Sequence, residues 1–201
     1  MEMLNAYHYK PEAAYEEAQN RIRLAGERGR NSLDLHSLGL TELPPEIGAL
    51  RGLERLNLEK NRLTGLPAEI GQLTDLNWLQ AGENSLISLP AEIAQLINLR
   101  TLNLSANKFS VLPEEICQLE NLVELWLSAN DLETIPAGIG KMAQLEGLYL
   151  SYNRLISLPL ELQKLKKLEW LYLEGNPGLG LADEVTRRAE DPFGILSALF
   201  V

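Results

Sequence analysis

Few side chains in this 201-residue chain have the types and spacing that catalysis or metal binding requires. His8 and His36 are the only histidines and Cys117 is the only cysteine. Their spacing matches no metal site, and no glycine-rich loop could cradle a phosphate. Asp34 lies two residues before His36, with two serines nearby, which superficially matches a nucleophilic triad. A catalytic triad also needs a pocket and an oxyanion hole, so whether these residues could act in catalysis depends on the secondary-structure element that carries them.

A second set of residues is better suited to recognition. The chain has three tryptophans, and Trp126, Tyr149 and Tyr172 follow one another in steps of 23 residues. Tryptophan and tyrosine are enriched at binding hot spots because they supply contact area at a small cost in entropy. Whether these side chains act together depends on the elements that position them.

Those elements are set by a repeat of 23 residues, of which residues 53–75 are a complete copy. An asparagine recurs at this step, as does a Leu-Pro or Ile-Pro pair. The asparagines are Asn61, Asn84, Asn107, Asn130, Asn153 and Asn176. A fixed period of this length indicates stacked supersecondary units. Each xLxLx segment alternates as a half-buried strand does, and each PxxIxxL segment leaves room for a short helical or 3₁₀ turn.

The consensus LxxLxLxxNxLxxLPxxIxxLxx resembles the leucine-rich repeat family, in the 23-residue LPxxI class of Ras-suppressor, Erbin and Scribble-type scaffolds. Residues 20–48 also resemble the start of the repeat region of bacterial Roco-type proteins. The resemblance implies an α/β fold, a right-handed solenoid or horseshoe with a parallel concave sheet. It also implies that the repeated asparagine is buried and bonded to the backbone of neighbouring coils, and that the chain recognises another protein.

We expect one continuous domain with a helical cap at each end. Residues 1–29 form the N-terminal cap, with a helix from residue 11 to about residue 28 whose apolar stripe is Tyr15, Ala18, Ile22 and Ala25. Residues 30–176 form about seven coils. Residues 177–201 form the C-terminal cap, with a short helix near 182–189 and an apolar helix over 193–200. The apolar side chains expected to be buried against the last coil are Phe193, Ile195, Leu196, Leu199 and Phe200.

In such a sheet the third, fifth and seventh residues of each repeat point into the concavity. This arrangement predicts a contiguous row of Trp126, Tyr149 and Tyr172, with Trp170 beside it and a gap at Gly147. The predicted partner-binding residues are Trp78, Trp126, Tyr149, Tyr152, Trp170, Tyr172, Arg55, Asn103 and Glu124. The alternative is a ladder of stacked aromatics that only stiffens the sheet.

Acidic residues surround the aromatic ones and favour a partner with Lys or Arg beside a hydrophobic anchor; a solvated acidic rim is the alternative. These residues are Glu124, Glu146, Glu169 and Glu174. Asp34 and His36 share the same flat face and could hydrogen-bond to each other, but a flat sheet has no pocket, so we predict no enzyme, cofactor or metal. Cys117 occupies a small-residue position and is predicted to be a buried structural residue.

The net charge of −10 and the pI near 4.8 argue against nucleic-acid binding and against an anionic membrane surface. A single cysteine and the absence of a secretory pattern favour a cytoplasmic protein in signalling or scaffolding. Three alternatives stay open: the regulatory region of a larger Roco-type GTPase, the target-recognition module of a bacterial effector, and a homodimer, which is possible but not predicted.

Overall fold

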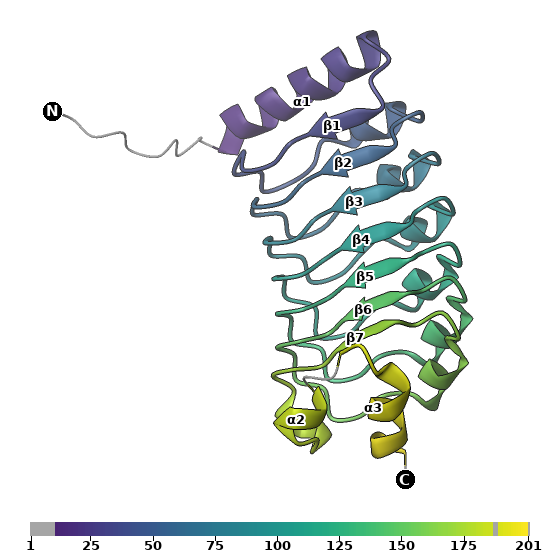
Figure 1. Ribbon diagram of the computed structural model, residues 1–201. Coiled ribbons are helices and arrows are strands. Elements are labelled where there is room, and N and C mark those ends of the chain that lie inside the picture. The colour runs from purple at the N-terminus through teal and green to yellow at the C-terminus, as the bar shows by residue number, and fades with distance from the viewer. Residues whose placement is uncertain (1–10, 187–188, 201) are drawn as a thin grey trace, which may run out of the picture.

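A computed structural model describes residues 11–186 and 189–200 of the chain. Its coils stack side by side, and each contributes one short strand to a parallel sheet in which the strand order follows the sequence (Figure 1). The strands of the described residues are β1 (Ser32–Asp34), β2 (Arg55–Asn57), β3 (Trp78–Gln80), β4 (Thr101–Asn103), β5 (Glu124–Trp126), β6 (Gly147–Tyr149) and β7 (Trp170–Tyr172). The predicted solenoid is confirmed.

Strand pairing follows the 23-residue step without a slip from β1 to β7. The central leucine of each strand pairs with the central leucine of the next, as Leu102 does with Leu125. These leucines are buried, whereas the residues on either side of them lie on the outward surface. Because side chains of a strand alternate between its faces, the register fixes which side chains become neighbours on the outward surface.

The opposite side of the solenoid consists of 3₁₀ helices that follow the Leu-Pro pairs. In coils two to six the proline has extended backbone angles, which ends the preceding turn and starts the helix. One side chain at the centre of each helix, an isoleucine or a leucine, is buried. These helices are Pro45–Ala49, Ala68–Gln72, Ala91–Gln95, Glu114–Gln118, Ala137–Lys141 and Leu160–Lys164.

A ladder of asparagines joins neighbouring coils. The Asn107 side chain donates to the carbonyl oxygens of Ala81 and Leu104, both at 3.0 Å, and accepts from the Leu86 N–H at 2.9 Å. Backbone groups that the turn leaves open are therefore satisfied inside the protein. In the first coil Leu38 replaces the asparagine and is buried.

Helix α1 (Pro11–Glu27) covers the first coil and forms the N-terminal cap (Figure 1). Its buried stripe contains Ala18, Ile22 and Ala25 as predicted, but Ala14 occupies the fourth buried position and Tyr15 is only half-buried. The Arg21 guanidinium donates to the carbonyl oxygen of Asp34 at 3.1 Å, which satisfies an acceptor on the edge strand β1. Residues 1–10 of the predicted cap lie outside the described residues.

The C-terminal cap is more irregular than predicted. It contains a 3₁₀ turn (Pro177–Leu179), helix α2 (Asp183–Thr186) and helix α3 (Pro192–Leu199). Of the helix expected over 182–189, the described residues contain α2; residues 187 and 188 lie outside the described residues, and Ala189 is in a turn. The backbone at Ala189 instead turns to the free edge of β7, where its carbonyl oxygen accepts from Leu171 N–H at 2.8 Å.

Helix α3 covers the last coil with some of the residues predicted for this role. Ile195 and Leu196 are buried, and Leu199 and Phe200 pack partly against the core. Phe193, which was predicted to be buried, is 39% exposed. The buried face of α3 is formed by Pro192, Ile195 and Leu196, and the Phe193 ring lies off that face, 5.9 Å from the Lys166 amine. Within residues 11–186 and 189–200, no helix is long and apolar enough to cross a bilayer.

Candidate functional site

The candidate site is the outward surface of the sheet, which we call the sheet face and which comprises the third, fifth and seventh residues of each coil. Strands β1–β4 carry its polar half and strands β5–β7 its aromatic half. All the predicted binding residues lie on strands of this face except Tyr152, which follows β6. Tyr152 has a left-handed backbone (φ 58°) and is 60% exposed at the margin of the aromatic half.

The aromatic row consists of Trp126, Tyr149 and Tyr172 on three successive strands. The ring centroids of Trp126 and Tyr149 are 3.7 Å apart with planes 8° from parallel. Those of Tyr149 and Tyr172 are 5.0 Å apart at 14°. The sheet register stacks the rings because strand spacing, roughly 4.8 Å, is close to the separation of stacked aromatics. The predicted contiguous row is confirmed.

Gly147 does not leave the gap that the sequence predicted. The Tyr149 ring lies over it, so a Cβ added at Gly147 would lie 2.8 Å from a ring carbon of Tyr149. Tyr149 therefore leans along its own strand, and the glycine is needed for this close approach. The prediction considered only that Gly147 has no side chain and did not consider that Tyr149, two residues later, could fill the space.

Trp170 begins β7 and pairs in register with Gly147 of β6, as predicted for a residue beside the row. Glu124 pairs with Gly147 on the other side. The third residues of these three coils are therefore Glu124, Gly147 and Trp170, and the Tyr149 ring covers the glycine in the middle. Trp78, the remaining tryptophan, lies two strands before Glu124 in the polar half.

Carboxylates of the aromatic half have no cation of their own. None of the five ion pairs among the described residues involves its acidic side chains, which are Glu124, Glu146, Glu169 and Glu174. Glu124 is half-buried, and the contact from its neighbour, the Thr101 hydroxyl, is long at 3.5 Å. Burial raises the pKa of Tyr149, and the negative charge of Glu124 raises it further.

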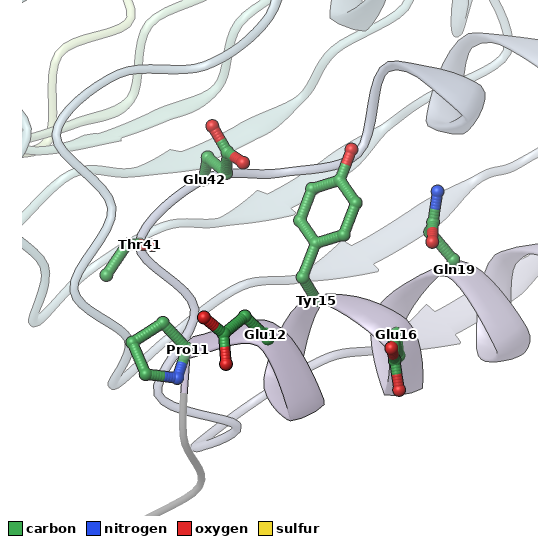
Figure 2. A pocket seen from close by; sticks show the side chains of 7 residues that line it. All are labelled: Pro11, Glu12, Tyr15, Glu16, Gln19, Thr41 and Glu42. Carbon is green, nitrogen blue, oxygen red and sulfur yellow. The ribbon is translucent and has the colours of Figure 1, made fainter.

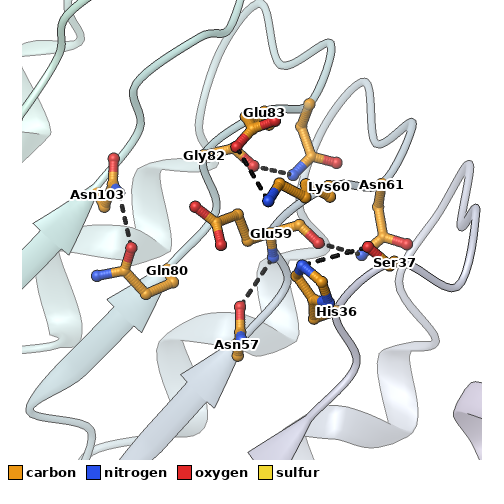
Figure 3. A network of polar contacts seen from close by, with 11 residues as sticks. His36, Ser37, Asn57, Glu59, Lys60, Asn61, Gln80, Gly82, Glu83 and Asn103 are labelled. Atoms are coloured by element: carbon orange, nitrogen blue, oxygen red, sulfur yellow. Dashed lines mark hydrogen bonds and ion pairs between the residues drawn. The ribbon is translucent and has the colours of Figure 1, made fainter.

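In the polar half the side chains bind one another (Figure 3). The Asn103 amide donates to the Gln80 side chain at 2.6 Å, and its oxygen accepts from Ser105 N–H at 2.9 Å. Lys60 pairs with Glu83 at 3.6 Å. Most polar groups drawn in Figure 3 thus already have an internal partner.

Arg55 and Trp78 form a contact within the polar half that joins a cation to an aromatic ring. The guanidinium carbon of Arg55 lies 4.4 Å from the Trp78 ring centroid, within the range of a cation–π interaction. Both residues were predicted to bind a partner, and the structure brings them together.

Asp34 and His36 do not form the side-chain hydrogen bond that their spacing would allow. The Asp34 carboxylate accepts from the backbone N–H of His36 at 3.0 Å, and His36 Nε2 lies 3.2 Å from the Ser37 hydroxyl. Asn57 makes the same local bond to Glu59 N–H, so this is a turn motif of the repeat. Among residues 11–186 and 189–200, no carboxylate bonds to the His36 ring as a triad requires.

Two hollows beside α1 were not found from the sequence. One, of about 370 Å³, has Tyr15 at its centre and carboxylates around it (Figure 2). It is lined by Pro11, Glu12, Tyr15, Glu16, Gln19, Thr41 and Glu42. Burial, then Glu46 and Glu42, raise the pKa of Tyr15. The other, of about 420 Å³, is more apolar and lies between Ile22 and Leu50. Nothing in the sequence periodicity indicated either hollow.

Cys117 is buried in its 3₁₀ helix, as predicted. Burial raises the pKa of its thiol from 9.0 to about 12, and Glu114 adds to the effect. The group is therefore a neutral thiol near pH 7 and a poor nucleophile.

Comparison with known proteins gives the family. Residues 82–186 match the family description "Leucine-rich repeat region", and residues 52–73 match "Leucine Rich Repeat". The chain therefore belongs to the leucine-rich repeat family. A comparison with curated proteins gives no match.

Solved structures with the same fold come from a bacterium and from plants. A leucine-rich repeat protein of Leptospira interrogans is 38% identical with a TM-score of 0.71, and the match covers 75% of this chain and 45% of that one. The plant peptide hormone receptor RGFR1, solved with RGF2, is 32% identical with a TM-score of 0.59, covering 73% and 28%.

The Arabidopsis receptor kinase HAESA, solved with the peptide hormone IDA and the co-receptor SERK1, is 28% identical with a TM-score of 0.66, covering 80% of this chain and 29% of that one. The chain thus spans less than half the length of each of these three structures.

Proposed function

We propose that this chain is a recognition module that binds another protein through the sheet face, with the aromatic half as the anchor. The observation that carries the proposal is the aromatic row. It is a stack of three rings on the outward side of the sheet, beside carboxylates that have no ion-pair partner among the described residues. Tyr172 remains 36% exposed, so the row has surface left for a ligand.

Two of the similar structures support a protein or peptide ligand. The receptor RGFR1 was solved with RGF2, and HAESA with a peptide hormone and a co-receptor. A partner of the present chain would carry basic residues beside an apolar anchor, because the aromatic half offers carboxylates next to rings. The net charge of −10 favours such a partner over nucleic acid.

The same proposal places the module in the cytoplasm, in signalling or scaffolding. Cys117, the single cysteine, is buried with a neutral thiol, which suits a reducing compartment. The 23-residue LPxxI consensus supports the class of Ras-suppressor, Erbin and Scribble-type scaffolds. The regulatory region of a Roco-type GTPase and the target-recognition part of a bacterial effector are the other settings that fit the same surface.

A quantitative pull-down tests the proposal. The bait is the wild type or the Trp126→Ala/Tyr149→Ala/Trp170→Ala variant, and thermal unfolding shows that both are folded. The control variant, Ile87→Ala/Val111→Ala/Ile156→Ala, removes as many apolar side chains, each more than 60% exposed and outside the sheet face. A partner kept by the control and lost by the first variant supports the proposal. Equal capture by all three baits would leave the aromatic row as reinforcement of the sheet.

A further inference from the structure

The aromatic half contains a position where the sheet face has no side chain of its own. In the line of third residues, Gly147 separates Glu124 from Trp170. Two strand spacings put the flanking backbones roughly 10 Å apart. The Tyr149 ring lies over Gly147, so this interval has an aromatic floor, a carboxylate on one side and an indole on the other.

Charge on this half of the face is entirely negative. Strands β5, β6 and β7 contain no lysine or arginine, and the seventh residues of their coils are Ser128, Ser151 and Glu174. Glu124 is half-buried, and none of the ion pairs of residues 11–186 and 189–200 includes it. A half-buried carboxylate beside aromatic rings favours a cation because the surrounding medium screens their attraction less than water does.

The polar half already contains this chemistry within the chain. The Arg55 guanidinium lies 4.4 Å from the Trp78 ring centroid on the same face. The aromatic half repeats the ring without the arginine: Trp170 occupies the third position of its coil, as Trp78 does, and no basic residue lies on the neighbouring strand.

We infer that an arginine side chain of the partner lies between Glu124 and Trp170, stacked on the Trp170 indole and paired with the Glu124 carboxylate. This inference rests on the proposed function, since it needs a protein partner on the sheet face. Arginine fits better than lysine because its planar guanidinium stacks on a ring and binds a carboxylate through two N–H groups together.

Selection from a random peptide library gives a probe without a known partner. Peptides are enriched on the immobilised wild-type protein and depleted on the Trp126→Ala/Tyr149→Ala/Trp170→Ala variant. We expect the enriched sequences to share an arginine next to an apolar residue. Failure to enrich any peptide that distinguishes the two proteins would overturn the proposed function, and this inference with it.

Titration calorimetry with one enriched peptide then measures how much the arginine of the peptide contributes to the binding affinity. Glu124→Gln is expected to weaken binding about tenfold, as loss of a charged hydrogen bond does. Glu92→Gln, the matched control, removes a half-buried carboxylate from a 3₁₀ helix on the opposite side of the solenoid and is expected to leave binding unchanged. Replacing the arginine of the peptide by citrulline, which keeps the shape and removes the charge, should weaken wild-type binding equally and have little further effect on Glu124→Gln.

Two outcomes would overturn the inference and leave the proposed function intact. One is enrichment of peptides without arginine that still require the aromatic row. The other is equal affinity of an arginine peptide for the wild type and Glu124→Gln.

Discussion

The two halves of the sheet face rest on the same interior but differ in what they leave for a ligand. Beneath both, the leucine core and the asparagine ladder repeat every 23 residues. Above it, polar side chains of β1–β4 bind one another, as Asn103 binds Gln80. In β5–β7 the rings stack, and the carboxylates have no ion pair among the described residues. The scaffold therefore sets the positions, while the choice of side chain decides which groups of the sheet face have a partner inside the protein.

Removing one asparagine from each half tests whether the interior is equivalent. Asn61 donates to the Leu35 and Leu58 carbonyl oxygens, and Asn153 donates to those of Leu127 and Leu150. Asn61→Ala and Asn153→Ala should each lower the free energy of unfolding by about 2–4 kcal/mol, since each leaves several buried backbone groups unsatisfied. Urea denaturation measures both. A loss confined to one variant would show that the two halves differ below the surface as well.

Truncating one residue on each half should separate them at the surface. Trp126→Ala removes a ring stacked at 3.7 Å and is expected to cost about 1–2 kcal/mol of unfolding free energy. Gln80→Ala removes one half-exposed hydrogen bond and should cost at most about 0.5 kcal/mol. The same urea titrations give both values. Equal costs would mean that the aromatic row does not stabilise the sheet.

Gly147→Ala should disturb the row without removing a ring. The added Cβ would lie 2.8 Å from Tyr149, and that ring has little room to move because rings stack on both of its faces. We expect a loss of about 1 kcal/mol, within the range for overpacking. Gly65→Ala is the control, since nothing lies within 4 Å of its Cβ. Thermal unfolding compares them, and a stable Gly147→Ala protein would mean that Tyr149 can move aside.

The smallest expected effect is the contribution of the raised Tyr149 pKa to the pH dependence of the free energy of unfolding. The Tyr149 phenol keeps its proton to a higher pH than a tyrosine of the unfolded chain, so this group contributes stability that is lost as the pH rises above about 10. Glu124→Gln removes one cause and should lower the pKa, whereas Glu59→Gln should not. Titration of tyrosine NMR signals follows this group. An unchanged pKa in Glu124→Gln would mean that burial and Tyr172, without Glu124, cause the shift.

The features that follow from periodicity could be predicted from the sequence. A constant step of 23 residues puts Trp126, Tyr149 and Tyr172 in register, and parallel strands then stack them. The contacts of a single side chain that has several possible partners nearby could not be predicted. Asp34 binds the closer backbone N–H instead of the His36 ring. Tyr149 leans over Gly147 because free space allows it.

Features of the caps were harder to predict because the repeat stops there. The hollow around Tyr15 depends on how α1 sits on the first coil, and no repeated residue fixes that packing. Phe193 was assigned to the core from its apolar character alone, but it lies off the face of α3 that Pro192, Ile195 and Leu196 bury.

Because the register is unbroken from β1 to β7, the number of coils between two residues of the sheet face sets the distance between them. Each coil joins its neighbours through the same leucine pairs and the same asparagine bonds, so coils are interchangeable at their junctions. Recombination that deleted or duplicated one coil between β3 and β5 would rejoin matching surfaces. It would move Trp78 and Trp126 together or apart by one strand spacing, roughly 4.8 Å. A gene of this kind can therefore change the distance between two side chains of the sheet face without altering the coil that carries either one.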